Sequence, residues 1–347
     1  MRIALMVSGF EDGGVERNLT NLAFGLHRLG VDVDLLAGDP GHPYVQCLPA
    51  AIGMIRMSAD GQLLANYLTD TRPDLIMTGK LVDDRAALAA RASLGLDLRV
   101  VATVGTPLSV SVAGNRFNPW RVFRATRRIR ADYRRLDGIT AVSDAVAIDL
   151  RRHFGLTEVP VRVLRNPIIP ADLNTRAAMA CPHPWLAPRE PPVVLAVGGL
   201  RKVKDFATLV RAFARLPAGI DARLLVLGEG KERARLTALV QRLGIGARVD
   251  LPGFVDDPFP FLARARVLVL SSRREGLPNV LVEAMALGIP VAATDCPGGV
   301  PGLLARGALG PLTPVGDADA LAASIAGLLQ VPTDPELLRR AAEPYGL

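Results

Sequence analysis

The sequence predicts an α/β fold made of two doubly wound parallel sheets, each covered by helices on both faces. Two observations along the chain predict it: short apolar runs alternate with helical patterns twice, and a Pro-rich stretch interrupts the alternation in the middle. The third is composition, because 347 residues that are 50% hydrophobic suffice for two cores. Parallel strands buried on both faces read as continuous apolar runs, as these do.

The first half of the chain contributes strands and helices in regular alternation. The strands are expected at 2–8, 32–37, 74–78, 98–104, 138–142 and 161–164, and the helices near 15–30, 83–95, 119–136 and 143–154. The alternation stops between Pro167 and Pro192, a stretch whose many prolines are typical of a linker. Further strands are then expected at the apolar runs 193–197, 223–227, 267–270 and 289–293.

These patterns divide the chain into an N-terminal domain at 1–170, a Pro-rich linker at 171–191 and a C-terminal domain at 192–347. The simplest architecture is two doubly wound domains that face each other across a cleft. Ligands of such sheets bind outside the carboxyl ends of the strands. The residues that directly follow strands are therefore the candidates for a functional site.

Composition limits the compartment and the chemistry. The net charge is +7, but 37 of the 41 basic residues are arginine, so the lysines Lys80, Lys202, Lys204 and Lys231 are the more informative cations. The three cysteines lack a C-x-x-C pair, which favours a reducing compartment, and the four histidines are scattered, which implies no metal site. The first nine residues predict a buried strand rather than a signal peptide, and no run reaches the roughly 18 apolar residues of a membrane span. We therefore expect a cytoplasmic protein.

The segment 275–283 carries two carboxylates, Glu275 and Glu283, on either side of a Gly-Leu-Pro-Asn turn that opens a helix. Pro278 favours the bend, and Asn279 is expected to cap the helix. A carboxylate on each side of the helix start suits a ligand with hydroxyl groups on both sides of a diphosphate, which describes a nucleotide-sugar. Two solvated glutamates beside a loop are the simpler alternative.

The start of that helix is expected to receive the diphosphate. Val280, Leu281 and Val282 fill the first helical turn, whose backbone N–H groups have no partner within the helix and are expected to point outward. Free N–H groups and the positive end of the helix dipole together make a phosphate seat.

Two other segments follow strands in the same way. Gly13-Gly14 comes after the first strand, where a glycine pair lets the backbone approach a phosphate closely, although an ordinary turn would look the same. The loop 198–205 follows the first strand of the second domain and places Lys204 near the start of a helix; the alternative is an exposed surface lysine. Three segments at the same edge of two sheets favour a common site.

These residues resemble the retaining glycosyltransferases of family 4, which have the GT-B fold of two Rossmann-like domains. That family includes many bacterial lipopolysaccharide, capsule and exopolysaccharide enzymes. The resemblance runs over nearly the whole chain and is carried by residues 13–16, 142–144, 165–167, 198–205, 227–230 and 275–283. Its most specific part is the E-x7-E pattern of 275–283.

The resemblance implies transfer of a sugar, with retention, from a nucleotide-sugar donor to a glycan or glycolipid acceptor in cell-surface polysaccharide biosynthesis. It assigns Glu275 to the donor sugar and Lys204 to the leaving diphosphate, as the catalytic pair, and Glu283 to the ribose hydroxyls. The donor-binding residues that it implies are Gly13, Gly14, Gly198, Arg201, Lys202, Asn279, Val280, Leu281 and Glu283. If a lysine and a helix dipole stabilise the charge that builds on the phosphates, neither a metal nor another cofactor is required.

The chain departs from the family pattern at two positions. Gly199 stands where the family's basic loop has an arginine, for which Arg201 or Lys202 could substitute, and no histidine lies near Gly105, where one is common. A catalytically weak or silent nucleotide-sugar-binding protein is therefore the alternative function. A dinucleotide-dependent oxidoreductase would share the sheets, but no G-x-G-x-x-G follows the first strand with an acid about 20 residues further on.

The helix expected at 119–136 separates apolar from basic residues at about 100° per residue. Its apolar face consists of Val122, Ala125, Thr126, Ile129, Tyr133 and Leu136, and its basic face of Arg121, Arg124, Arg127, Arg128, Arg130, Arg134 and Arg135. Trp120 and Phe123 fall on the basic side. Either this face is simply solvated, or it docks on an anionic membrane surface. We expect no nucleic-acid partner, because no recognised binding module accompanies the charge.

Overall fold

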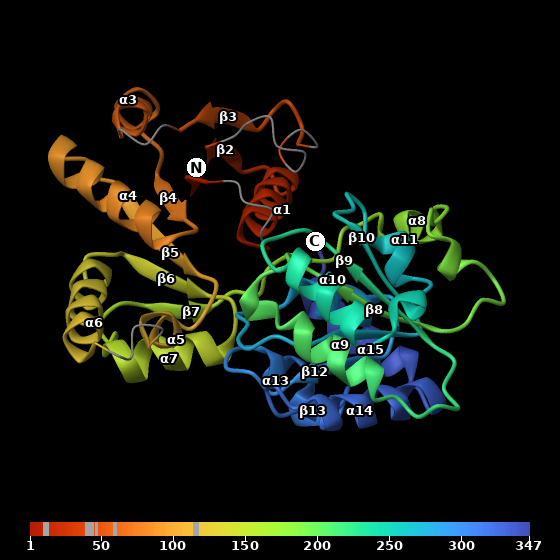
Figure 1. The fold of residues 1–347 in the computed structure, drawn as a ribbon. Coiled ribbons are helices and arrows are strands. Elements are labelled where there is room, and N and C mark those ends of the chain that lie inside the picture. The colour runs from red at the N-terminus through yellow and green to blue at the C-terminus, as the bar shows by residue number, and fades with distance from the viewer. Residues whose placement is uncertain (10–13, 39–44, 46–47, 58–60, 114–117) are drawn as a thin grey trace. The chain divides into compact units, whose positions relative to one another are not determined.

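A computed structural model describes residues 1–9, 14–38, 45, 48–57, 61–113 and 118–347. The chain divides into two compact units, Met1–Pro167 together with Leu347, and Ile168–Gly346 (Figure 1). Within the described residues one unit has a seven-stranded sheet and the other a six-stranded sheet, and all strand pairs are parallel. The predicted fold class, two doubly wound α/β halves, is thereby confirmed.

The sheet of the first unit has the strand order β3-β2-β1-β4-β5-β6-β7. Its strands are β1 (Arg2–Val7), β2 (Asp32–Ala37), β3 (Gly53–Arg56), β4 (Leu75–Thr78), β5 (Arg99–Val104), β6 (Gly138–Ala141) and β7 (Val161–Val163). Its helices are α1 (Gly14–Arg28), α3 (Gln62–Thr71), α4 (Leu81–Leu94), α5 (Leu108–Ala113), α6 (Pro119–Tyr133) and α7 (Asp144–Phe154). The strand order reverses between β1 and β4, and this is the place where doubly wound sheets bind ligands.

Three elements of the first unit, β3, α3 and α5, were not predicted from the sequence. The side chains of β3 are alternately half-buried and exposed over only four residues, so this edge strand has no continuous apolar run. By contrast β1 pairs on both sides, with β2 and β4, and its last five residues are all buried. A central strand such as β1 is therefore easier to predict from the sequence than this edge strand.

The sheet of the second unit has the order β10-β9-β8-β11-β12-β13. Its strands are β8 (Val193–Val197), β9 (Arg223–Leu227), β10 (Val249–Gly253), β11 (Val267–Leu270), β12 (Val291–Thr294) and β13 (Leu312–Thr313). Its helices are α8 (Leu173–Ala178), α9 (Phe206–Ala214), α10 (Arg233–Arg242), α11 (Phe259–Leu262), α12 (Asn279–Ala286), α13 (Val300–Leu303), α14 (Ala318–Gln330) and α15 (Pro335–Ala342). The Pro-rich stretch 171–191 belongs to this unit and contains α8.

The strands of this second sheet are buried on both faces. Successive residues of β8, such as Val194 and Leu195, pack into two different hydrophobic clusters, because side chains alternate across a strand. One cluster includes residues of α11, α12 and α15, and the other residues of α9, α10 and α14. Helices thus cover both faces and leave the carboxyl ends of the strands to loops.

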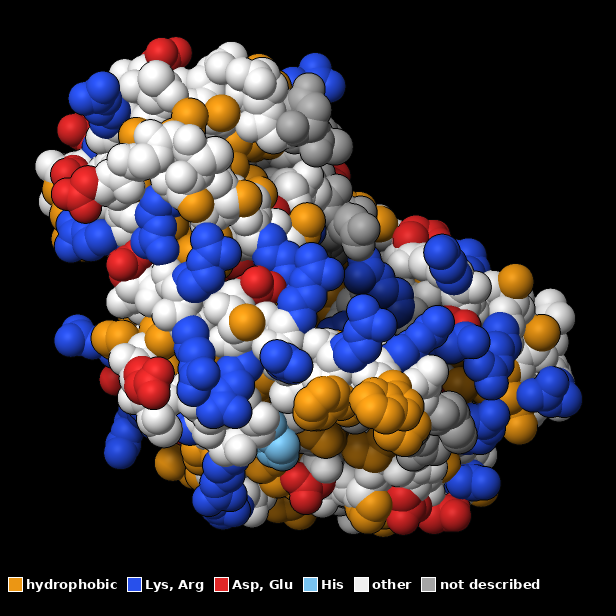
Figure 2. All heavy atoms as spheres, turned by 90° about the vertical axis from the view of Figure 1, so that its left-hand side faces the viewer, with side chains coloured by type: hydrophobic (Ala, Val, Ile, Leu, Met, Phe, Trp, Pro, Cys, Tyr) orange, Lys and Arg blue, Asp and Glu red, His pale blue; other side chains and the backbone are white. Residues whose placement is uncertain are grey.

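In the first unit, α6 packs through Ile129 and Tyr133, which are buried, and turns its arginines outward. Trp120 is 76% exposed and Phe123 is 58% exposed. Figure 2 views the molecule from the side of α6 and shows many basic side chains on this face together with an exposed hydrophobic patch. None of the helices in the described ranges combines the length and the apolar character that crossing a bilayer requires.

Two buried carboxylates lie at the start of α4, at an adjacent acidic pair that the sequence predicts to cap this helix. Asp83 and Asp84 would be helix caps by their sequence position, but the cap position of α4 is Lys80 and no side chain caps it. Asp83 instead accepts hydrogen bonds from the backbone N–H of Ser8, at 3.3 Å. Asp84 accepts from the hydroxyl of Tyr133 on α6, at 2.8 Å. The two carboxylates therefore hold α4 to its neighbours.

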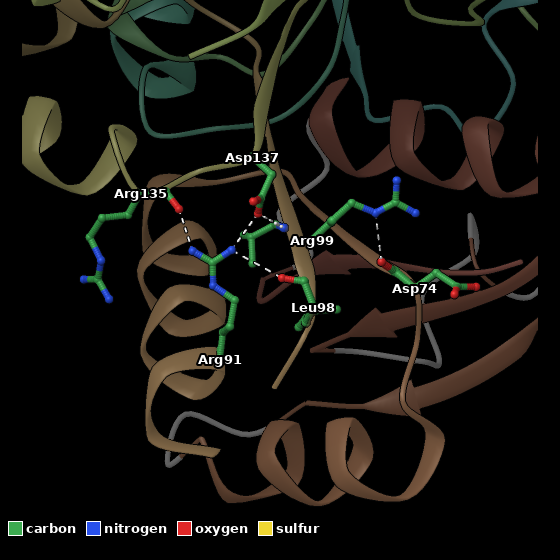
Figure 3. A network of polar contacts seen from close by, with 7 residues as sticks. Asp74, Arg91, Leu98, Arg99, Arg135 and Asp137 are labelled. Atoms are coloured by element: carbon green, nitrogen blue, oxygen red, sulfur yellow. Dashed lines mark hydrogen bonds and ion pairs between the residues drawn. The ribbon is translucent and has the colours of Figure 1, made fainter. Parts of the chain in front are cut away.

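A second polar network ties the other end of α4 to the loop between α6 and β6 (Figure 3). Arg91 forms an ion pair with Asp137, with 2.6 Å between Nη1 and Oδ2, and donates to the carbonyl oxygens of Arg135 and Leu98. Asp137 also accepts from the backbone N–H of Val100 at 2.7 Å. Together with the Asp84–Tyr133 hydrogen bond, these contacts connect the carboxyl-terminal end of α6 and the loop after it to both ends of α4.

Candidate functional site in the second unit

The candidate site lies where three neighbouring strands of the second sheet end. β8, β11 and β12 are adjacent in the sheet order, so the loops that follow them, 198–205, 271–278 and 295–299, lie at one edge. The sequence-predicted residues Lys204 and Glu275 come from the first two of these loops. The third loop was not predicted to take part.

Lys204 and Glu275 form an ion pair, with 2.6 Å between Nζ and Oε1. The hydroxyl of Ser272 donates to the same carboxylate oxygen, also at 2.6 Å. The lysine side chain is 23% exposed and that of the glutamate 13%, so the pair is accessible from solvent but largely enclosed. The structure thus brings together the two residues expected to be catalytic, which are 71 positions apart in the sequence.

The loop that carries Lys204 is fastened to the end of β11. The hydroxyl of Ser271 donates to the carbonyl oxygen of Lys204 at 2.8 Å, and the backbone N–H of Arg273 donates to that of Val203 at 2.8 Å. Asp205, which is buried, pairs with Arg273 at 2.9 Å. The position of the lysine therefore depends on residues just after β11.

The predicted cations Arg201 and Lys202 are both exposed. A Cβ atom at Gly199 would lie 3.3 Å from Nε of Arg201, so the arginine side chain passes beside the position where the family has an arginine. Gly198 lies under the lysine stem, since a Cβ there would be 3.4 Å from Cε of Lys204. Arg201 is thus the better placed of the two substitutes.

Glu275 is positioned by a close approach of two loops that sequence analysis missed. Its backbone N–H donates to the carbonyl oxygen of Pro297 at 3.1 Å, and Gly299 donates to Gly276 at 2.7 Å. Gly298 has a φ of +125°, and a Cβ atom there would lie 1.4 Å from the carbonyl oxygen of Glu275. Only glycine fits. The signal in the sequence is Pro297-Gly298-Gly299 directly after an apolar strand.

The start of α12 differs from expectation in two ways. Its cap position is Pro278, without a side-chain cap, and Asn279 is the first helical residue, so the predicted capping role of Asn279 is wrong. The N–H of Leu281 donates to the carbonyl oxygen of Pro278 at 3.1 Å, and Leu281 is fully buried, so its N–H does not point outward as predicted. Val280, the second helical residue, lies in the first turn, where backbone N–H groups have no partner within the helix. Glu283, the fifth helical residue, is 2% exposed.

A buried thiol lies close to the pair. Burial, and secondly the negative charge of Glu275, raises the pKa of Cys296 to about 12. The thiol therefore stays protonated at neutral pH and is a poor nucleophile. Cys181 and Cys296 are free cysteines, while Cys47 lies outside the described residues.

Of the predicted glycine pair, Gly13 lies outside the described residues and Gly14 begins α1 in the first unit. At the carboxyl ends of β1 and β4 the structure shows a polar cluster that sequence analysis missed. Lys80 pairs with Glu16 at 2.8 Å and donates to the carbonyl oxygen of Gly9 at 2.6 Å. The signal was the scarcity of lysine, of which Lys80 is one of four.

No group of three His, Cys, Asp or Glu side chains in the described part of the chain is arranged to hold a metal ion. The sequence predicts that the acidic pair Asp256-Asp257 caps the helix that follows it. The cap position of α11 is Pro258, without a side-chain cap, and Asp257, one residue earlier, accepts a hydrogen bond from the backbone N–H of Phe259 at 3.0 Å.

Two family models match the chain. One, described as Glycosyltransferase Family 4, matches residues 12–172, and the other, Glycosyl transferases group 1, matches residues 182–344. Together the two matched ranges contain both the glycine pair of the first unit and the Lys204–Glu275 site of the second.

Two curated proteins are similar to parts of the chain. The lipopolysaccharide core biosynthesis glycosyltransferase LpsE of Rhizobium meliloti is 40% identical over 157 residues, which is 45% of this chain and 44% of LpsE. The N-acetylgalactosamine-N,N'-diacetylbacillosaminyl-diphospho-undecaprenol 4-alpha-N-acetylgalactosaminyltransferase of Campylobacter jejuni is 30% identical over 198 residues, 57% of this chain and 52% of that protein. The chain thus matches about half the length of these relatives.

Among solved structures, that of Anabaena Alr3699/HepE in complex with UDP and glucose is similar over the whole chain. It superposes with a TM-score of 0.78 at 21% identity and covers 100% of this chain and 96% of its own. At that level of identity the similarity shows a shared fold.

Proposed function

Because the chain belongs to the glycosyltransferases that these two family models describe, we propose that it transfers a sugar from a nucleotide-sugar donor to a glycan or glycolipid acceptor, with retention. The observation that carries this proposal is the ion pair of Lys204 and Glu275, 2.6 Å apart, beside the start of α12. A cation suited to a diphosphate and a carboxylate suited to a sugar meet at one set of strand ends.

The chemistry divides between these groups. As the bond from the anomeric carbon to the diphosphate breaks, the sugar becomes oxocarbenium-like and negative charge builds on the phosphates. The ammonium group of Lys204 and the first N–H groups of α12 stabilise the diphosphate, and Glu275 contacts the sugar where positive charge develops. Glu283 binds the ribose hydroxyls. With these charges supplied by the protein, we propose that neither a metal nor another cofactor is needed.

The acceptor class is proposed from the named relatives. LpsE acts in lipopolysaccharide core biosynthesis, and the C. jejuni protein is named for a diphospho-undecaprenol-linked sugar acceptor. We propose that this protein likewise extends a cell-surface glycan or glycolipid, in the cytoplasm at the inner face of the membrane. HepE, crystallised with UDP and glucose, supports a nucleoside diphosphate donor.

A membrane-facing surface on α6 fits that location. Arg121, Arg124, Arg127 and Arg128 are exposed, and in the described part of the chain no carboxylate lies within ion-pair distance of them. Their neighbours Trp120 and Phe123 are also exposed, as an edge-to-face pair with ring centroids 6.4 Å apart. Exposed arginines beside exposed aromatic rings suit the interface of an anionic bilayer.

A panel of nucleotide-sugars tests the proposed reaction through release of the nucleoside diphosphate, because a working transferase leaks slowly to water. We expect hydrolysis of at least one donor. Lys204→Ala should lower that rate roughly 30- to 200-fold, about 2–3 kcal/mol, by removing a charge-assisted contact to the leaving group. Arg242→Ala, which removes an exposed cation on α10, is the control. Tight donor binding without any turnover would favour the silent-binder alternative.

A further inference from the structure

The carboxylate of Glu275 has two donors on a single oxygen. Nζ of Lys204 and Oγ of Ser272 both lie 2.6 Å from Oε1. Within the described residues Glu275 is the only carboxylate within ion-pair distance of Lys204. The positive charge of Lys204, which is proposed to bind the diphosphate, is therefore balanced by the carboxylate of Glu275.

We propose that Glu275 is a competing counter-ion that the donor diphosphate displaces from Lys204, and that Ser272 is the positioning residue that then holds Glu275 at the sugar. This inference rests on the proposed function and adds an order of events to it. When the diphosphate binds, the ammonium group of Lys204 leaves Glu275 and turns to the phosphates, while the carboxylate of Glu275 stays in place.

The lysine is the partner free to move. Its charge sits on a flexible four-carbon stem, and its side chain is 23% exposed. Because Gly198 has no side chain, there is space beside this stem: a Cβ at that position would already be 3.4 Å from Cε of Lys204. A small swing of the stem therefore moves the ammonium group without moving the backbone.

The carboxylate is the partner that stays. The backbone of Glu275 is bound to Pro297 and pressed against Gly298. Ser272 is fully buried, and its carbonyl oxygen accepts a hydrogen bond from the hydroxyl of Thr294 on β12, which is also fully buried. The backbone of Ser272, just after β11, is thus bound to the adjacent strand β12. Once Lys204 leaves, Ser272 remains as the donor to Oε1.

Competition predicts that removing the charge of Glu275 strengthens nucleotide binding. We expect Glu275→Gln to bind a nucleoside diphosphate roughly 3- to 30-fold more tightly than wild type, because a charge-assisted hydrogen bond no longer has to be broken. Donor hydrolysis should nevertheless fall by at least 100-fold, because the sugar loses its carboxylate. Glu283→Gln, the other carboxylate of the same motif, is the matched control and should not bind more tightly.

The experiment measures binding of UDP, GDP, ADP and CDP by calorimetry, and donor hydrolysis, for wild type and both variants. Tighter binding by Glu275→Gln but not by Glu283→Gln supports the proposal. Equal or weaker binding by Glu275→Gln overturns it, even if wild type hydrolyses a donor normally. If wild type binds none of the four nucleotides, the proposed function falls and this inference with it.

The role of Ser272 is tested separately through kinetics. We expect Ser272→Ala to lower kcat for donor hydrolysis roughly tenfold with KM changed less than twofold, since the hydroxyl acts after the donor is bound. Ser272→Thr keeps the hydroxyl and should restore kcat. An unchanged kcat in Ser272→Ala, or no recovery in Ser272→Thr at unchanged melting temperature, overturns the positioning role.

Discussion

The buried carboxyl group of Asp84 couples the stability of the first unit to pH. Burial raises its pKa from 3.8 to about 6, although Thr78 and Tyr133 both donate to it and oppose the shift. Between these two pH values the native state binds more protons than the unfolded state, so the free energy of unfolding falls as pH rises. The loss of stability caused by a charged, buried Asp84 therefore reaches its full value above pH 6 and is absent below pH 3.8.

We predict that Asp84→Asn stabilises the protein near pH 7, on the order of 1–3 kcal/mol, with a gain that shrinks toward pH 4. An amide can still accept from Tyr133, while Thr78 can turn to the carbonyl oxygen of Val101, 3.3 Å away. Urea unfolding of variant and wild type across pH 4–7 measures the difference. The control is Asp70→Asn, which removes an exposed carboxylate on α3. Its free energy of unfolding should change with pH in parallel with that of wild type. If the free energies of unfolding of Asp84→Asn and wild type differed by the same amount at every pH, the raised pKa of Asp84 would be contradicted.

At the scale of elements, the loops after β11 and β12 act as one unit through Gly298. We predict that Gly298→Ala destabilises the protein by about 1–3 kcal/mol and lowers donor hydrolysis more than tenfold, because the new methyl group overlaps the carbonyl oxygen of Glu275. Gly302→Ala on α13 is the matched control, since a Cβ there meets nothing within 4 Å. Thermal unfolding and hydrolysis of both variants check this, and a fully active Gly298→Ala would show that the loop contact is dispensable.

The α6 surface makes a second prediction at this scale. The protein should sediment with vesicles of phosphatidylglycerol at low salt, not with neutral vesicles, and be released as salt rises, because exposed charges are screened over about 10 Å at 0.1 M. Replacing Arg121, Arg124, Arg127 and Arg128 by glutamine should abolish sedimentation and spare donor hydrolysis. Arg134 is left in place because it already pairs with Glu158 at 3.7 Å.

A control variant and a local probe show whether the effect belongs to α6. Four exposed arginines elsewhere, Arg152, Arg162, Arg242 and Arg340, can be replaced by glutamine to give the same change in charge. The chain has two tryptophans, so Trp185→Phe leaves Trp120 as the sole reporter, whose emission should shift to the blue on vesicles. If both quadruple variants lost sedimentation equally, or if the emission of Trp120 did not shift, the basic face of α6 would be a solvated surface without a membrane role.

At the scale of the whole molecule, the reaction itself is the test. We predict that an α-linked nucleotide-sugar gives an α-linked product and that the rate is unchanged in excess EDTA, because the protein's own cations stabilise the leaving diphosphate. Product NMR and a parallel assay with added Mg²⁺ or Mn²⁺ measure both. A β-linked product would rule out retention, and loss of turnover in EDTA would show that the lysine and the helix dipole do not suffice.

Much of this molecule follows from the sequence alone. The apolar runs of the central strands predicted the two parallel sheets, because a strand buried on both faces must be apolar throughout. The motif around Glu275 and the rarity of lysine pointed to Lys204, since both follow strands. The helix expected at 143–154 is α7, and the structure places its cap at Ser143, whose hydroxyl oxygen accepts from the backbone N–H of Val146.

What only the tertiary structure decided concerns contacts between residues far apart in the chain. Ser272, Thr294 and Gly298 reach the site because β11 and β12 are adjacent in the sheet, and strand order is set by long-range packing. Asp84 looked like a helix cap, but a buried hydroxyl of α6 turned it inward. Asn279 looked like one too, until the backbone placed the helix start one residue earlier. Local chemistry therefore determined which residues were available for the site, and the packing of sheets and helices determined which of them meet.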